Sequence, residues 1–318
     1  MDSKKTVAIA GAGDVAKFLV EELERAKDYN IVVLTRGHRP WFAERAGITV
    51  RLTDYSADSV RTILDDVGAV VLFSFIHDNS PFYNTTHEAF LAACRTSRTC
   101  KRFVPSECGG DLDAHPDKPR FYIPTHGAFR EVLKAQSEVE WTLLNNGWFM
   151  DYVLPPEMSY MKSIVPVWPL DLKTGRVLVP GTGEEPIGLT AARDVARAAV
   201  KLVDASAWDP ITYVCGENTT WNKLIRDVEE FYSLPGAAER KFDVSYLSID
   251  EIKTALEVHK NDEDPSALWK AYMDEWNYTG ASALPWDKVE SQRRRFFRDI
   301  KFRTVRELLE DAHADGFA

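Results

Sequence analysis

A chain of 318 residues exceeds the size at which one hydrophobic core usually keeps growing, so we expect a large domain and a smaller lobe. Its 45% hydrophobic and 28% charged residues are typical of a folded globular protein and exclude a disordered or fibrous chain. The net charge of −10 disfavours nucleic acid as a direct ligand.

Membrane and metal signals are absent from the sequence. No charged and apolar leader precedes the first predicted strand, and no apolar run approaches the roughly 20 residues that cross a bilayer. The four cysteines, which we interpret as reduced thiols, lack the pair spacing typical of metal sites. We therefore expect a cytoplasmic protein without a metal ion or a membrane partner. The sequence leaves the oligomeric state open.

Residues 6–104 alternate short apolar runs with longer amphipathic runs. This pattern is typical of buried parallel strands that are joined by crossover helices. The predicted strands are Thr6–Ala10, Ile31–Thr35, Thr49–Leu52, Ala69–Phe73 and Arg102–Val104, and the predicted helices lie near residues 14–27, 57–66 and 84–97. A helix over Ala128–Ser137 and a strand over Trp141–Leu144 follow, so we expect at least six strands.

The pattern changes after Gly147, where prolines become frequent. A helix near residues 191–204 and a strand over Ile211–Val214 are predicted, and from about residue 219 the chain is mostly helical and rich in aromatic residues. We interpret most of these aromatic residues as core, with a pocket for a bulky substrate as the alternative.

The sequence therefore predicts an α/β fold with two parts. Residues 1–150, with late elements from residues 175–218, are predicted to form a Rossmann-type domain with a doubly wound parallel sheet. Residues 151–174 and 219–318 are predicted to form a smaller, mostly helical lobe that binds the substrate.

The strongest local signal lies between the first predicted strand and the first helix. Gly11 permits a tight turn, Gly13 lets the backbone approach a pyrophosphate, and Ala16 is small enough for the helix to pack on the strand. Free amide groups and the helix dipole then face the anion. The residues of this predicted dinucleotide-binding turn are Gly11, Ala12, Gly13, Asp14, Val15 and Ala16.

The end of the second predicted strand favours one dinucleotide over the other. NAD-binding chains usually carry an acidic residue there for the ribose 2′-hydroxyl. This chain has Arg36 instead, and Arg39 adds a second positive charge. Because a guanidinium pairs well with a 2′-phosphate, we predict NADP(H) as the cofactor.

The third and fourth predicted strands end in further candidate cofactor residues. Asp54 either accepts hydrogen bonds near the adenine or caps the helix that follows. Ser74 and Phe75 lie at the carboxyl edge of the sheet, where ligands of such folds bind.

Two later segments complete a family resemblance. Residues 101–109 read Lys-Arg-Phe-Val-Pro-Ser-Glu-Cys-Gly, and residues 140–149 read Glu-Trp-Thr-Leu-Leu-Asn-Asn-Gly-Trp-Phe. With the glycine-rich turn and Arg36, they make residues 5–205 resemble the NmrA-like and isoflavone-reductase-like branch of atypical short-chain dehydrogenases/reductases. The Pro-Ser-Glu element is the most specific of these motifs.

The resemblance implies where cofactor and substrate bind. The residues that it places against the cofactor near the nicotinamide are Pro105, Ser106, Glu107 and Asn145. The residues that we expect in the substrate pocket are Trp148, Phe149 and Tyr152.

One position departs from the family pattern. Reductases of this group carry a lysine four residues before an arginine, on the helix that precedes the sixth strand, and this lysine acts as proton relay or general base. The matching arginine here is Arg130, and four residues earlier stands His126. Because histidine exchanges protons near neutral pH, His126 is the predicted proton relay, with Glu107 as a second catalytic residue. A solvated or capping histidine is the alternative.

These features predict an NADP(H)-dependent oxidoreductase that acts on a hydrophobic aromatic small molecule, in secondary metabolism. The reacting group is a carbonyl, an iminium or an activated alkene, and the cofactor transfers the hydride. Two alternatives stay open. One is an NADP(H)-binding family member that catalyses a non-redox cyclisation or isomerisation by acid–base chemistry. The other is an NmrA-type regulator that senses the dinucleotide and binds partner proteins.

Overall fold

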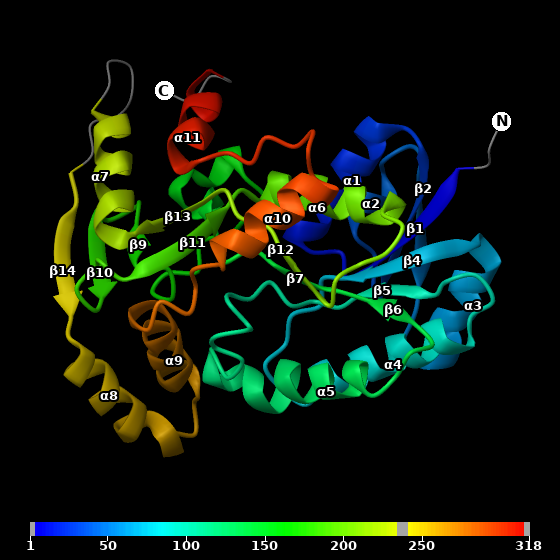
Figure 1. Cartoon of the computed structure of the whole chain (residues 1–318), viewed down its shortest axis with the longest axis horizontal. Helices are drawn as coiled ribbons and strands as arrows, with labels where there is room; N and C mark the ends of the chain where they lie inside the picture. Colours follow the sequence, from blue (N-terminus) through cyan, green and yellow to red (C-terminus); the bar gives the residue numbers. More distant parts are fainter. Residues whose placement is uncertain (1–3, 234–240, 315–318) are drawn as a thin grey trace.

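The computed structural model describes residues 4–233 and 241–314, arranged as two lobes side by side (Figure 1). The first lobe is built on a six-stranded parallel sheet with the order β3-β2-β1-β4-β5-β6. Its strands are β1 (Lys5–Ala10), β2 (Tyr29–Thr35), β3 (Ile48–Leu52), β4 (Ala69–Ser74), β5 (Arg102–Val104) and β6 (Glu140–Trp141). This is the order of a doubly wound Rossmann sheet, so the predicted fold class is confirmed.

Helices cover both faces of this sheet. They are α1 (Asp14–Ala26), α3 (Ala57–Val67), α4 (Phe82–Thr96), α5 (Ala128–Lys134) and α6 (Ala192–Asp204), with the short α2 (Pro40–Ala43) beside β3. Side chains of β1 alternate between the faces. Val7 and Ile9 belong to the core under α1 and α6, whereas Ala8 and Ala10 belong to the core under α3, α4 and α5.

The parallel strands bring distant residues to one edge. Gly11 follows β1, Arg36 follows β2, Phe75 follows β4 and Pro105 follows β5. Because the carboxyl ends of parallel strands meet at the same edge of a sheet, the predicted cofactor residues are gathered there.

The second lobe contains two small sheets as well as helices (Figure 1). One sheet joins β9 (Leu170–Asp171), β10 (Arg176–Pro180) and β14 (Asp243–Leu247), and the other joins β8 (Trp148–Phe149), β11 (Pro186–Thr190) and β13 (Glu217–Thr220). The strands β7 (Leu143–Asn145) and β12 (Ile211–Tyr213) pair at the junction of the lobes.

The C-terminal third is mostly helical, as the sequence predicts. Its helices are α7 (Trp221–Tyr232), α8 (Ile249–Val258), α9 (Ser266–Tyr278), α10 (Trp286–Phe296) and α11 (Val305–Ala314). Short 3₁₀ turns lie at Arg120–Tyr122, Met150–Val153, Pro156–Met158 and His259–Asn261, and Ile123–Gly127 forms a π-helical turn before α5.

The late elements of residues 175–218 divide between the lobes. Helix α6 packs against α1 of the Rossmann lobe. Strand β10 instead forms a ladder with β9 and β14, both in the second lobe. The assignment of these residues to the first domain is therefore wrong for β10, because its ladder partner β14 lies more than sixty residues further along the chain.

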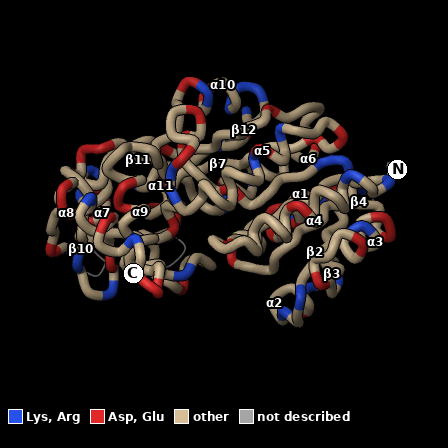
Figure 2. Tube along the Cα trace, turned by 90° about the horizontal axis from the view of Figure 1, so that it is seen from below, with Lys and Arg blue, Asp and Glu red and all other residues tan. Residues whose placement is uncertain are grey.

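Aromatic residues form much of the core of the second lobe. Trp148, Trp168, Trp221 and Trp276 pack edge to face, with ring centroids 4.9–6.4 Å apart. Figure 2 shows basic and acidic residues interspersed along both lobes. Within residues 4–233 and 241–314, no helix is long and apolar enough to span a membrane, and no cluster of His, Cys, Asp or Glu side chains is suited to a metal ion.

Candidate functional site

The glycine-rich turn has the geometry that a bound anion requires. Gly11 has a φ of +95°, and its N–H donates to the carbonyl of Leu34 at 3.1 Å. A Cβ on Gly11 would lie 3.1 Å from the backbone carbon of Phe75, whereas a Cβ on Gly13 would meet nothing within 4 Å. Gly11 is therefore needed for the turn itself, and Gly13 leaves open space in front of the backbone.

Helix α1 begins directly behind this open space. Gly13 is its N-cap and supplies no side-chain cap, so the amide groups of the first turn keep their donors available. Ala16 is fully buried against the sheet, and Val15 faces the cavity described below. The carboxylate of Asp14, the first helical residue, lies 3.0 Å from Lys17 Nζ and 3.9 Å from Lys162 Nζ.

Arg36 lies in a surface groove and forms no ion pair with a described carboxylate. Its guanidinium carbon is 5.5 Å from the ring centre of Tyr55 and 5.0 Å from that of Phe82. The groove also includes Asp54, whose carboxylate accepts the N–H of Ser56 at 2.9 Å. Two aromatic rings thus hold a guanidinium whose hydrogen-bonding edge is free for a phosphate.

The two alternatives for Asp54 are separated by this geometry. Ser56, not Asp54, is the N-cap of α3, because its hydroxyl accepts the N–H of Ser59. The capping interpretation of Asp54 is therefore wrong, and the carboxylate stays exposed beside Arg36. Arg39 is also exposed, at the start of α2.

The two candidates at the end of β4 point in different directions. Phe75 lines the cavity. Ser74 is 1% exposed, and its hydroxyl bonds to Nε2 of His87 at 3.0 Å. Since the Ser74 side chain points into the core, its placement argues against the predicted contact of this side chain with the cofactor.

A cavity of about 410 Å³ lies between the two lobes at this edge of the sheet. The residues of the first lobe that line it are Val15, Phe75, His77, Asn79, Ser106, Cys108, Gly109, Pro119, Phe121 and Tyr122. The cavity-lining residues that follow β6 in the chain are Gly147, Trp148, Phe149, Tyr152, Met161, Ile164, Val167, Trp269, Met273 and Trp276. The predicted pocket residues Trp148, Phe149 and Tyr152 and the predicted cofactor residue Ser106 thus all line this cavity.

Two other predicted residues lie outside the cavity lining, in or against the loop of residues 105–109. The side-chain oxygen of Asn145 accepts the N–H of Gly109 at 2.8 Å, and Asn145 is fully buried. Pro105 is buried at the start of the same loop. Neither lines the cavity, so their geometry indicates that they shape the loop of residues 105–109.

Glu107 forms a buried ion pair with Arg130. Nη2 and Nε of Arg130 both donate to its carboxylate, and Nη1 donates to the carbonyl of Pro116 at 2.9 Å. Burial raises the pKa of the Glu107 carboxyl, and the charge of Arg130 opposes the shift. Glu107 does not line the cavity, and its oxygens face the guanidinium of Arg130, so this placement argues against the predicted catalytic role.

His126 lies inside a column of stacked rings. Its ring is 3.6 Å from that of Tyr122 and 3.8 Å from that of Tyr83, and Tyr83 in turn stacks on His87 at 4.0 Å. Nδ1 of His126 bonds to the Thr125 hydroxyl at 3.0 Å, and Nε2 has no partner among the described residues.

This placement argues against the predicted proton relay. His126 is 0% exposed and does not line the cavity, because the ring of Tyr122 does so in its place. Burial lowers the pKa of His126 well below its usual value, and the charges of His77 and Arg130 act in the same direction. The ring is therefore neutral and enclosed. The alternative of a solvated or capping histidine is also wrong.

Two cavity groups with exchangeable protons were missed by the sequence reasoning. His77 follows β4 by three residues, so its position at the carboxyl edge was the available signal. Tyr122 precedes the π-helical turn, and its phenol forms no hydrogen bond with a described residue. Burial and the nearby Glu107 raise the pKa of Tyr122, so its phenol keeps its proton. No sequence signal identified the second-lobe residues Met161, Ile164 and Met273.

The strand order, the open glycine turn and the interlobe cavity define a Rossmann-type protein with a dinucleotide-binding turn and a small-molecule pocket. No family model matches the chain. The chain is 36% identical over 314 residues to the oxidoreductase swnR of Metarhizium robertsii, and the aligned residues cover 98% of this chain and 99% of that protein.

Two further comparisons agree. The chain is 24% identical to an NmrA-like family domain-containing oxidoreductase of Gibberella moniliformis, over 67% of this chain and 63% of that protein. The binary complex of leucoanthocyanidin reductase with NADPH from Vitis vinifera has the same fold, with a TM-score of 0.74, 18% identity and coverage of 97% and 99%. The chain belongs to the NmrA-like and isoflavone-reductase-like family of oxidoreductases.

Proposed function

We propose that this protein is an NADP(H)-dependent oxidoreductase that acts on a hydrophobic, aromatic small molecule of secondary metabolism. The observation that carries the proposal is the position of the cavity. Val15, next to the glycine turn, and Phe75 and Ser106, at the carboxyl edge of the sheet, form one side of it. Aromatic residues of the second lobe, including Trp269 and Trp276, form the other.

The residues present fit an NADP(H) molecule. The open space at Gly13 admits the pyrophosphate against the first turn of α1. Arg36 would hold the 2′-phosphate, between the rings of Tyr55 and Phe82. The bound cofactor would supply or accept a hydride, and the protein would orient the substrate beside it and exclude water.

The cavity accepts a carbonyl, an iminium or an activated alkene. Among the described residues, no carboxylate lines it, since Glu107 pairs with Arg130 and Asp151 accepts from the N–H of Ala192 at 2.7 Å. A cationic iminium would therefore be held by aromatic faces rather than by an acid. The phenols of Tyr122 and Tyr152 and the imidazole of His77 are among the cavity groups that can exchange a proton with the product.

Calorimetry and absorbance at 340 nm test the proposal. We expect the wild-type protein to bind NADPH more tightly than NADH, and Arg36→Ala to weaken NADPH binding roughly tenfold or more while changing NADH binding little. With aromatic carbonyls and enones, we expect loss of absorbance at 340 nm. The absence of heat with either dinucleotide would contradict the proposal.

One observation favours the alternative of a non-redox cyclisation or isomerisation. Among the described residues, no ammonium group lines the cavity, and His126 stands at the position where the family pattern has a lysine. A cyclisation or isomerisation would rely on Tyr122 and His77 as acid and base. Product formed with no change in absorbance at 340 nm would favour this alternative over the reductase.

A further inference from the structure

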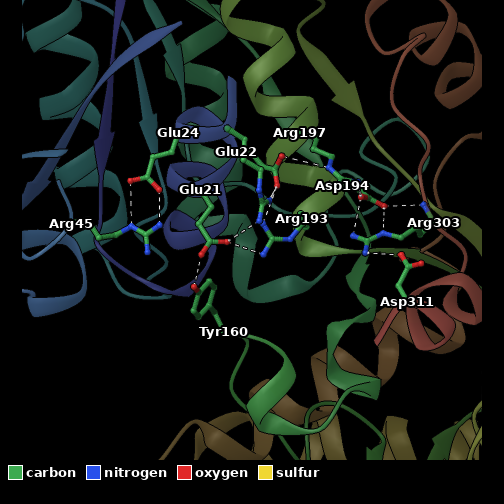
Figure 3. Close-up of polar contacts among 11 residues, drawn as sticks. Glu21, Glu22, Glu24, Arg45, Tyr160, Arg193, Asp194, Arg197, Arg303 and Asp311 are labelled. Carbon is green, nitrogen blue, oxygen red and sulfur yellow. Dashed lines mark hydrogen bonds and ion pairs between the residues drawn. The ribbon is translucent and has the colours of Figure 1, made fainter. Parts of the chain in front are cut away.

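A segment of the second lobe reaches across to the Rossmann lobe beside the glycine turn. We call residues 159–164 the strap. The phenol of Tyr160 donates to Glu21 of α1 at 2.6 Å, and its ring packs edge to face on Phe18 and Trp41, with centroids 5.0 and 5.5 Å apart. Figure 3 shows this phenol pointing at Glu21, which also accepts from Arg193 at 2.8 Å. The strap is therefore fixed to the outer side of α1.

Beyond this anchor, the strap passes the start of α1. Nζ of Lys162 lies 3.9 Å from the carboxylate of Asp14, which directly follows Gly13 in the turn. The Lys162 side chain is 85% exposed, and Asp14 is its sole ion-pair partner among the described residues. A long, exposed ion pair of this kind contributes little free energy, so releasing it costs little.

Negative charges at the start of α1 require positively charged partners, and Lys17 and Lys162 lie within reach of Asp14 there. Asp14 directly follows Gly13, so its carboxylate and a pyrophosphate bound at the start of α1 would be like charges that repel each other. Lys17, 3.0 Å from Asp14, neutralises that carboxylate from within the helix. The Lys162 ammonium is then available to a second anion.

The strap also forms part of the cavity wall. Met161 and Ile164, on either side of Lys162, both line the interlobe cavity. Six consecutive residues therefore contact α1, approach the glycine turn and face the cavity.

We propose that the strap is a cofactor-binding element contributed by the second lobe, in which Lys162 pairs with the pyrophosphate and Tyr160 holds the strap against α1. This inference rests on the proposed function. A bound dinucleotide would then fix Met161 and Ile164 in the cavity wall, so that the substrate pocket is complete only when the cofactor is present.

Calorimetric titration of the full chain with NADPH and NADH tests the strap. Both dinucleotides carry the pyrophosphate, so we expect Lys162→Ala to weaken both by a similar factor, roughly five- to tenfold, and to reduce the salt dependence of binding. Arg36→Ala lowers the preference for NADPH instead. We expect Lys162→Arg to restore affinity and Lys253→Ala, an exposed lysine on α8, to change nothing.

Tyr160→Phe supplies a second variant that keeps the aromatic ring and removes the hydroxyl that donates to Glu21. We expect it to weaken NADPH binding severalfold with an unchanged melting temperature. Wild-type affinity and wild-type salt dependence in Lys162→Ala overturn the strap proposal alone. If the wild-type protein binds neither dinucleotide, the proposed function falls and the strap proposal falls with it.

Discussion

Gly11 and Gly13 have different roles in the glycine-rich turn. Gly11 has a left-handed backbone, and a Cβ there would touch the backbone after β4. Gly13 has an ordinary φ of −99° and open space in front of it. The first residue is constrained by the fold and the second by the ligand that we propose.

Alanine at each position separates these constraints. We expect Gly11→Ala to lower the free energy of unfolding by about 1–3 kcal/mol, because alanine is strained at positive φ. Gly13→Ala should change stability by only a few tenths of a kcal/mol. It should nevertheless weaken NADPH binding by roughly tenfold or more, because its Cβ enters the pyrophosphate space. Urea unfolding and calorimetry measure the two effects; a stable Gly13→Ala with wild-type affinity contradicts this account.

At the scale of elements, the π-helical turn Ile123–Gly127 places His126 in a stack of rings from separate helices. Tyr83 and His87 come from α4, and Tyr122 comes from the preceding 3₁₀ turn. The stack buries two imidazoles in their neutral form, since burial also lowers the pKa of His87 to about 4. A π-turn often marks a functional site, but here it places His126 behind Tyr122, whose ring lines the cavity.

The stack makes folding sensitive to acid. Burial lowers the pKa of His126 in the folded protein, so below about pH 6.5 the unfolded chain binds a proton there that the folded protein does not, and stability is lost as the pH falls. His126→Phe keeps a stacking ring and removes this proton. We expect the stability of the variant relative to wild type to rise by about 1.4 kcal/mol between pH 7.5 and 5.5.

Urea unfolding across this pH range measures the difference, with the substitution of an exposed histidine, His38→Phe, as the matched control. Parallel pH profiles for His126→Phe and wild type would show that His126 takes up a proton in the folded protein as readily as in the unfolded chain, which would contradict its burial in neutral form. Loss of turnover in a stably folded His126→Phe variant would instead support the predicted catalytic role of His126.

At the scale of the whole molecule, the chain after α10 returns to the Rossmann lobe and is fastened there. Asp194 of α6 is fully buried and accepts from Nη2 of Arg303 at 3.0 Å, from its Nε at 3.2 Å and from its backbone N–H at 2.9 Å (Figure 3). Arg197 donates to the same carboxylate at 3.0 Å. This ion pair connects α6 to the segment that leads into α11.

Removing the carboxylate should therefore loosen the junction. We expect Asp194→Ala to lower the free energy of unfolding by about 3 kcal/mol or more, because it leaves the largely buried guanidinium of Arg303 with Asp311, an exposed carboxylate 3.4 Å away, as its remaining ion-pair partner among the described residues. Glu230→Ala, which breaks the exposed pair with Arg306, should cost less than about 0.5 kcal/mol. Thermal or urea unfolding compares the two, and equal effects would contradict the role of Asp194.

Local patterns were sufficient for the Rossmann sheet and for the strand–turn–helix geometry around Gly11 and Gly13, because each depends on a short stretch of sequence. The orientation of Ser74 and Glu107 was not predictable, since it depends on His87 and Arg130, which come from other helices. The pairing of β10 with β14 and the contact of Tyr160 with Glu21 join segments far apart in sequence. The spacing of apolar residues along the sequence carries no information about such long-range contacts.

The cavity has walls of different origin, with consequences for how this protein can diversify. The sheet edge carries the dinucleotide turn, whereas Trp269 and Met273 come from α9, which has no part in that turn. Replacements on α9 can therefore alter which molecules are accepted while leaving the hydride chemistry intact. Relatives with the same nucleotide preference would then turn over unrelated compounds.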